Sequence, residues 1–132
     1  MTDLETQNLT RIEQNKNADL PLDGDLTLPY YDGLSLVNIP GTITELLGAP
    51  AFGSPALDSS ITSVLGGPYK KVVFLLVDAL GYVLLQDLMA ADPDLVWSGL
   101  GEKGVFAPIT SICPSTTASA LTTLWTGVAV AS

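Results

Sequence analysis

The chain has 132 residues, 47% of them hydrophobic, and its 14 acidic and 5 basic residues give a net charge of −9. This length predicts one domain with a moderate core. The charge argues against binding to a nucleic-acid duplex or to an anionic membrane surface, because both need clustered Lys and Arg. An acidic protein can still bind a small phosphate ester when metal ions reverse the local field.

The first 33 residues are predicted to be a flexible acidic arm followed by a surface loop, since they are polar and then rich in turn formers. The N-terminal residues lack a basic segment followed by an apolar one, so no signal peptide is indicated. The single cysteine, Cys113, cannot form an internal disulfide. These features predict a cytoplasmic protein.

Residues 34–132 are predicted to form an α/β unit, beginning with short helices over 38–48 and 56–65. Pro40 suits the first position of the former and Gly48 suits its end. The apolar run 72–77 then predicts a strand buried on both faces, and residues 81–91 predict a helix.

A second short helical piece is predicted over 95–100, and a second strand over 104–112, where Pro108 favours an edge or a bulge. The last predicted element is a helix over 116–126, ended by Gly127. Its residues Leu121, Leu124 and Trp125 are expected to point toward the core. Strand, helix, strand and helix in this order predict a parallel sheet with right-handed crossovers. The stretch after Val105 is uncharged, but its prolines and hydroxyl residues argue against a membrane span.

Asp78 directly follows the apolar run 72–77. A carboxylate at the end of a buried strand is costly unless a cation, a helix N-terminus or a metal ion pairs with it. Asp78 therefore either binds a metal ion or caps the helix that begins near Gly81, and the residues alone favour neither.

Hydroxyl side chains gather at the start of the last predicted helix, and one of them is expected to cap it. A further hydroxyl there would lie in the positive end of the helix dipole, which favours an alkoxide and a bound phosphate. With a divalent ion held by Asp78, such a hydroxyl can act as a nucleophile. The hydroxyl residues are Ser115, Thr116, Thr117 and Ser119.

Val77-Asp78-Ala-Leu-Gly81, and Pro114-Ser-Thr-Thr117 with Gly127 ten residues later, resemble the N-terminal part of the alkaline phosphatase superfamily. The likeness extends over roughly residues 30 to 132 and is closest to the type I phosphodiesterase/nucleotide pyrophosphatase branch. It implies an alkaline-phosphatase-like parallel-sheet core. It also implies that Asp78 and Thr117 ligate one of two metal ions, usually zinc. Thr117 would form a phospho-threonine intermediate with a small phosphodiester or nucleotide substrate.

The sequence departs from this family at two points. Where the family often places an Asn, three residues after the nucleophile, this chain has Ala120, and the chain contains no histidine. Because the family's other metal ligands are downstream Asp and His residues, the sequence is interpreted as the N-terminal fragment of a larger hydrolase. By itself it is predicted to be inactive.

Other interpretations stay open at this point. A sulfatase is disfavoured, because the segment after Cys113 lacks the Arg that its modified nucleophile needs. A phosphomutase or a phosphonate hydrolase of the same superfamily remains an alternative. A different class of answer is a complete, non-catalytic acidic interaction module in which Asp78 and Thr117 serve only as caps.

Overall fold

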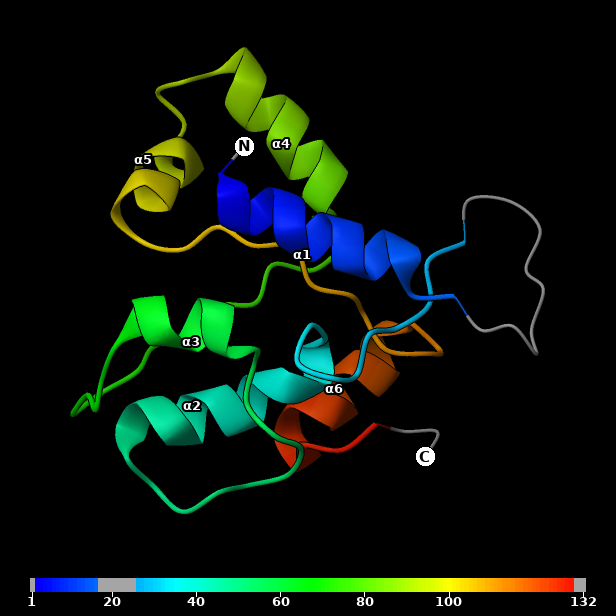
Figure 1. The fold of residues 1–132 in the computed structure, drawn as a ribbon, viewed down its shortest axis with the longest axis vertical. Helices are drawn as coiled ribbons and strands as arrows, with labels where there is room; N and C mark the ends of the chain where they lie inside the picture. The colour runs from blue at the N-terminus through cyan, green and yellow to red at the C-terminus, as the bar shows by residue number, and fades with distance from the viewer. Residues whose placement is uncertain (1, 17–25, 130–132) are drawn as a thin grey trace.

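The computed structural model describes residues 2–16 and 26–129, and these residues fold into helices joined by long coils (Figure 1). The helices are α1 (Asp3–Gln14), the 3-10 helix η1 (Leu36–Asn38), α2 (Ile39–Leu47), α3 (Ser59–Leu65), α4 (Tyr82–Ala91), α5 (Val96–Lys103) and α6 (Thr117–Thr126). No helix in the described part of the chain is long and apolar enough to cross a membrane.

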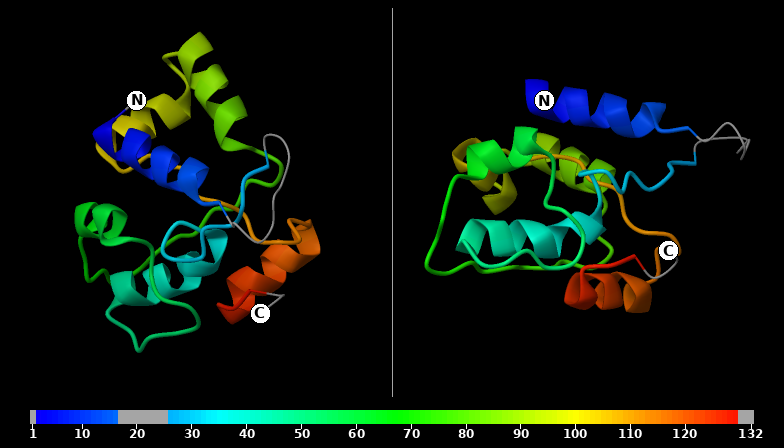
Figure 2. Two further views of the ribbon diagram at one scale, coloured as in Figure 1. Left: turned by 45° about the vertical axis from the view of Figure 1, so that its right-hand side comes forward. Right: turned by 60° about the horizontal axis from the view of Figure 1, so that its bottom comes forward.

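The helices form two groups with a small core between them. Figure 1 shows α4 and α5 at one end of the molecule, α2 and α6 at the other, and α1 and α3 between them. The right-hand view of Figure 2 shows α1 along one outer side. The buried core cluster comprises Ile12 of α1, Leu34, Leu57 and Ile61 of α3. Burial of these side chains therefore fastens the N-terminal helix to the middle of the chain.

The prediction of a flexible N-terminal arm is wrong for Asp3–Gln14, which forms helix α1. Thr2 and Glu5 make a capping box, in which each side chain bonds the backbone N–H of the other. Ile12 is only 6% exposed, so the helix also has an apolar anchor. Among the turn formers of the expected surface loop, Asp32 and Gly33 lie in a turn, whereas Pro21 and Asp23-Gly24 lie outside the described residues.

The predicted helices are confirmed, with small shifts at their ends. Gly48 and Gly127 end α2 and α6 in the left-handed conformation, with φ of 62° and 71°. Glycine adopts this conformation at little cost, so both helices stop where the sequence indicates.

The predicted parallel sheet is wrong for the described residues, which contain no strand and only two isolated β-bridges. Val72–Val77 is unpaired coil, and within 104–112 only Thr110 forms a bridge, parallel to Ser35. Apolar, β-branched residues favour a pleated conformation, but a strand forms only where a second strand supplies hydrogen-bond partners. The described residues provide no such neighbour for the run 72–77.

The prediction that α6 turns its apolar residues inward is wrong for Leu121 and Trp125, whereas Leu124 is half-buried. Trp125 is 80% exposed and Leu121 is 39% exposed, whereas Thr123 is fully buried. Helix α6 packs against η1 and α2, and this contact covers the face that carries Thr123. The apolar face is left open because no strand among the described residues covers it.

A buried amide holds the loop that precedes α2. The Asn38 side chain accepts a hydrogen bond from Ser35 N at 3.1 Å and donates to the carbonyl oxygens of Tyr31 and Pro55 at 3.2 and 3.0 Å. Asn38 is 1% exposed, so these bonds are shielded from water. These hydrogen bonds fix the segment around Ser35, which forms the parallel β-bridge with Thr110.

The Arg11–Asp58 ion pair, with 3.0 Å between Nη1 and Oδ2, gives a pH-dependent contribution to stability. Hydrogen bonding by Ser60, whose backbone N–H donates to Asp58 Oδ1 at 2.9 Å, and the Arg11 guanidinium lower the pKa of the Asp58 carboxyl below its ordinary value of 3.8. Because the pKa of Asp58 is lower in the folded than in the unfolded chain, its carboxylate stabilises the fold above pH 3.8. This stabilisation is lost as the pH falls through the pKa of the folded state.

We therefore expect the difference in unfolding free energy between the wild type and Asp58→Asn to shrink on acidification. Urea denaturation at neutral pH and at about pH 3 measures this difference. A difference in unfolding free energy that is constant, or that grows in acid, would contradict the lowered pKa of Asp58.

Candidate functional site

Asp78 lies at the end of the long coil that leads into α4. The next residue, Ala79, has a φ of 59°, and its backbone N–H donates to Asp78 Oδ1 at 2.9 Å. A left-handed alanine is uncommon, and the bond to the Asp78 carboxylate accompanies it here. The N-cap of α4 is Gly81, which makes no side-chain cap bond. Asp78 is therefore not the cap of this helix.

Thr117 is the first residue of α6, and its neighbour Thr116 caps the helix. Thr116 Oγ1 accepts a hydrogen bond from Ser119 N at 3.3 Å, so the expected hydroxyl cap is confirmed at Thr116. The Thr117 hydroxyl is left for another partner. It donates to Asp78 Oδ2 at 3.2 Å across 39 residues of chain.

The structure thus brings together the two residues that the sequence singled out. Their expected setting, the carboxyl edge of a parallel sheet, is absent from the described residues. Both residues nevertheless lie where an apolar stretch ends and a helix begins. Both side chains are exposed, so the pair is open to a ligand from solvent.

A pocket of about 570 Å³ surrounds the pair. Its polar lining is rich in hydroxyl groups. The start of α4, at Gly81 and Tyr82, and the start of α6 form part of its wall. The first backbone N–H groups of a helix have no intrahelical acceptor and carry positive partial charge. The hydroxyl residues of the lining are Tyr82, Thr110, Ser111, Ser115 and Thr117.

The sequence did not single out Thr110 and Ser111 as site residues. The bridge to Ser35 places them, through Leu36 N to Thr110 O at 2.9 Å and Thr110 N to Leu34 O at 2.8 Å. A signal was present, because these polar residues come late in an apolar run, much as Asp78 follows 72–77. No pattern in the chain indicated their long-range pairing with Leu34–Leu36.

Tyr82 connects the pocket to α1. Its ring stacks on Phe106 with centroids 5.6 Å apart, and its hydroxyl donates to Glu5 Oε1 at 3.3 Å and accepts from Gln86 at 2.7 Å. Burial and the Glu5 carboxylate raise the pKa of the Tyr82 phenol above its ordinary value of 10.0. Tyr82 therefore stays protonated at neutral pH and acts here as a packing group.

The donor set at the pair fits part of a metal site. The Asp78 carboxylate and the Thr117 hydroxyl are oxygen donors of the kind that bind divalent ions. Within residues 2–16 and 26–129 there is no group of three or more His, Cys, Asp or Glu able to hold a metal ion. The pair supplies two ligands, fewer than a catalytic zinc ion takes from protein. Ala120 also lines the pocket but brings no polar group to it.

Comparisons of this chain with protein-family models, with curated proteins and with solved structures found no match.

Proposed function

We propose that this chain contributes the nucleophile and one metal ligand to a metal-dependent phosphoric ester hydrolase, acting on small phosphodiesters or nucleotide pyrophosphates. The hydrogen bond from Thr117 Oγ1 to Asp78 Oδ2 is the observation that carries the proposal. A residue pair predicted from two distant motifs meets at the start of a helix and inside one pocket. The resemblance to the type I phosphodiesterase/nucleotide pyrophosphatase family remains part of this proposal.

Each side chain has a definite task in this reaction. Asp78 orients the Thr117 hydroxyl, and the start of α6 offers N–H groups and positive potential to a phosphate oxygen. Thr117 Oγ1 forms a bond to phosphorus while the bond to the leaving alcohol breaks, and water then cleaves the phospho-threonine. Two bound zinc ions would lower the pKa of the nucleophile and neutralise charge on the phosphoryl oxygens. Asp78 and Thr117 would hold one of them, with further ligands from residues outside this sequence.

The caps of the two helices support this proposal over a purely structural role. If Asp78 and Thr117 were caps only, their side chains would bond the first backbone N–H groups of α4 and α6. Instead Gly81 and Thr116 occupy the two cap positions. The Asp78 and Thr117 side chains bond each other instead, which leaves them available to a metal ion and its substrate.

Zinc binding by the full-length protein tests the assignment of Asp78. We expect Asp78→Asn to weaken zinc affinity by at least about tenfold, the loss found even for residues that only support a metal ligand. Isothermal titration of the metal-free protein measures this. Asp87→Asn is the matched control, since Asp87 is an exposed aspartate on α4 that does not line this pocket. Equal zinc affinity in the wild type and in Asp78→Asn would refute the assignment.

A further inference from the structure

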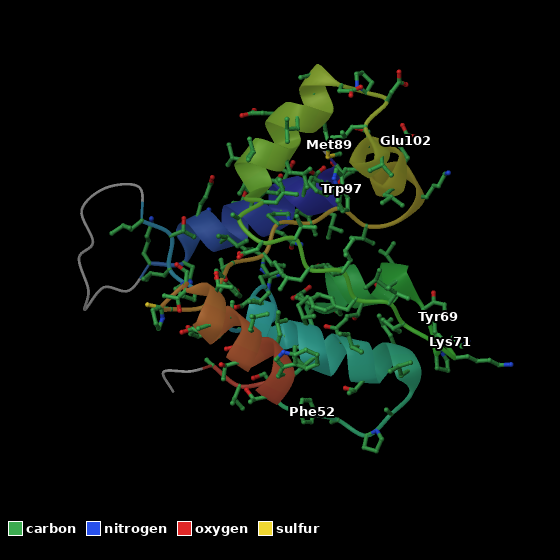
Figure 3. All side chains as sticks on the ribbon, turned by 180° about the vertical axis from the view of Figure 1, so that it is seen from behind. Phe52, Tyr69, Lys71, Met89, Trp97 and Glu102 are labelled. Atoms are coloured by element: carbon green, nitrogen blue, oxygen red, sulfur yellow. The ribbon has the colours of Figure 1, made fainter. Side chains whose placement is uncertain are left out.

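An apolar pocket adjoins the pocket that surrounds Asp78 and Thr117. Its volume is about 390 Å³, and side chains of α2, of α6 and of the coil before Asp78 form its wall. Leu76 and Leu121 line both pockets, so the two pockets meet at these side chains. Figures 1 and 3 show α2 and α6 side by side from opposite sides of the molecule.

Helix α6 leads from one pocket to the other. Thr117 is its first residue, and Leu121 and Trp125 follow one and two turns later on the same side of the helix. At about 1.5 Å per residue, Leu121 lies about 6 Å and Trp125 about 12 Å along the axis from Thr117. Trp125 lines the apolar pocket. A group attached to phosphorus at Thr117 can therefore reach that pocket by running along α6.

The lining of the two pockets carries a single charge. Asp78 is the only charged residue among the described residues that line either pocket, and neither Lys nor Arg is among them. A second phosphate group would bring negative charge that no cationic side chain there can pair with. The apolar pocket is lined by hydrophobic residues throughout. The two linings thus favour an uncharged ester group over the second phosphate of a nucleotide pyrophosphate.

The place of the apolar pocket also indicates which ester group it takes. In phosphoryl transfer the attacking and leaving oxygens lie roughly in line on opposite sides of phosphorus. The leaving group therefore departs on the side away from Thr117 Oγ1, and the other groups on phosphorus lie to the side. The ester group that can run along α6 is the one that stays bound to phosphorus.

We propose that the substrate is a phosphodiester with one apolar ester group, and that this retained group lies in the apolar pocket against Phe74 and Trp125. The proposal rests on the proposed hydrolase function and narrows its substrate class. Trp125 is 80% exposed, so the ester group covers a side chain that is otherwise open to water. A mostly apolar site with a few polar groups at one end is typical of small-molecule pockets.

Two p-nitrophenyl phosphodiesters that differ only in the retained ester group test this proposal. With the proposed hydrolase and zinc, we expect kcat/KM for hexyl p-nitrophenyl phosphate to exceed that for methyl p-nitrophenyl phosphate by at least about tenfold. Both esters lose p-nitrophenolate, so the leaving group is the same. No turnover of either ester would overturn the proposed function and this proposal with it. Equal kcat/KM for the two esters would overturn this proposal alone.

Substitutions of Trp125 separate this pocket from general hydrophobic attraction. Trp125→Ala should lower the hexyl-to-methyl ratio of kcat/KM by at least about threefold, because apolar contact with the chain is lost. Trp125→Phe keeps an aromatic ring and should preserve most of the ratio. Leu88→Ala is the control, since Leu88 is an exposed leucine of α4 that lines neither pocket, and the ratio should equal that of the wild type. An unchanged ratio in Trp125→Ala would contradict the proposal.

A binding measurement on the full chain does not depend on turnover. Trp97 and Trp125 are the two tryptophans of the sequence, and Figure 3 shows Trp97 beside α5, away from α2 and α6. On addition of hexyl methyl phosphate we expect the indole N–H signal of Trp125 to shift in NMR spectra, while that of Trp97 stays in place. Dimethyl phosphate lacks the apolar chain and should shift neither signal. Equal shifts of both signals, or no shift of the Trp125 signal, would overturn the proposal.

Discussion

Thr117→Ala is expected to lower phosphodiester turnover by the proposed hydrolase by at least about a thousandfold, as losing a nucleophile does in other hydrolases. The variant lacks the oxygen that attacks phosphorus, while the Asp78 carboxylate stays in place. Release of p-nitrophenol from bis(p-nitrophenyl) phosphate in the presence of zinc measures the effect. Zinc content is measured in parallel and should change little.

Two variants sharpen this test. Thr117→Ser keeps a hydroxyl at the same position and should retain measurable turnover. Thr122→Ala removes a hydroxyl from the same helix, where it only bonds the Ala118 carbonyl, and should leave turnover unchanged. Wild-type turnover in Thr117→Ala would mean that the nucleophile has been placed in the wrong register, and Thr116 or Ser115 would become the candidate.

Asn38→Ala is expected to lower the free energy of unfolding by about 3 kcal/mol, since three buried hydrogen bonds are lost together. The partners left behind are Ser35 N and the carbonyl oxygens of Tyr31 and Pro55, at a side chain that is 1% exposed. Ser35 carries the bridge to Thr110, so the pocket wall should loosen as well. Urea denaturation and hydrogen exchange of the Thr110 amide measure the two effects.

Asn15→Ala is the matched control for this substitution. Its amide also donates to two carbonyl oxygens, those of Leu28 and Pro29, but the side chain is only partly buried. Water can replace the lost bonds, so we expect a cost of about 1 kcal/mol. Equal costs in Asn15→Ala and Asn38→Ala would show that burial is not what makes Asn38 important.

The helices could be predicted from the sequence because their signals are local. Pro40 and Gly48 delimit α2, and Gly127 ends α6, through backbone preferences that act within a single turn. Helix α1 was missed although Thr2 and Glu5 have the spacing of a capping box. Its polar composition indicated disorder, and the packing of Ile12 against residues some fifty positions away is not visible in a local pattern.

The sheet was mispredicted because strands depend on partners far away in the chain. The run 72–77 has the composition of a buried strand, yet its conformation is decided by whether another strand lies beside it. In the described residues the only parallel pairing joins Ser35 to Thr110, and it is a single bridge. The exposure of Trp125 follows from the same absence, since a sheet was expected to cover α6.

Asp78 and Thr117 lie together although the described residues contain no sheet. Asp78 and Thr117 were selected by residue type and by their places before α4 and at the start of α6, and these local features persist without a sheet. Thr110 and Ser111 were missed because a non-local bridge brings them to the pocket. The roles assigned to Asp78 and Thr117 remain proposals.

In the proposed reaction Thr117 becomes covalently bound to phosphorus, and acid quenching during turnover would trap this adduct. The proposed hydrolase is mixed with zinc and bis(p-nitrophenyl) phosphate, quenched, digested and analysed by mass spectrometry. We expect a phosphoryl adduct on the peptide that contains Thr117, localised by fragmentation to that residue. An adduct on Ser115 or Thr116 instead, or steady turnover without any adduct, would contradict it.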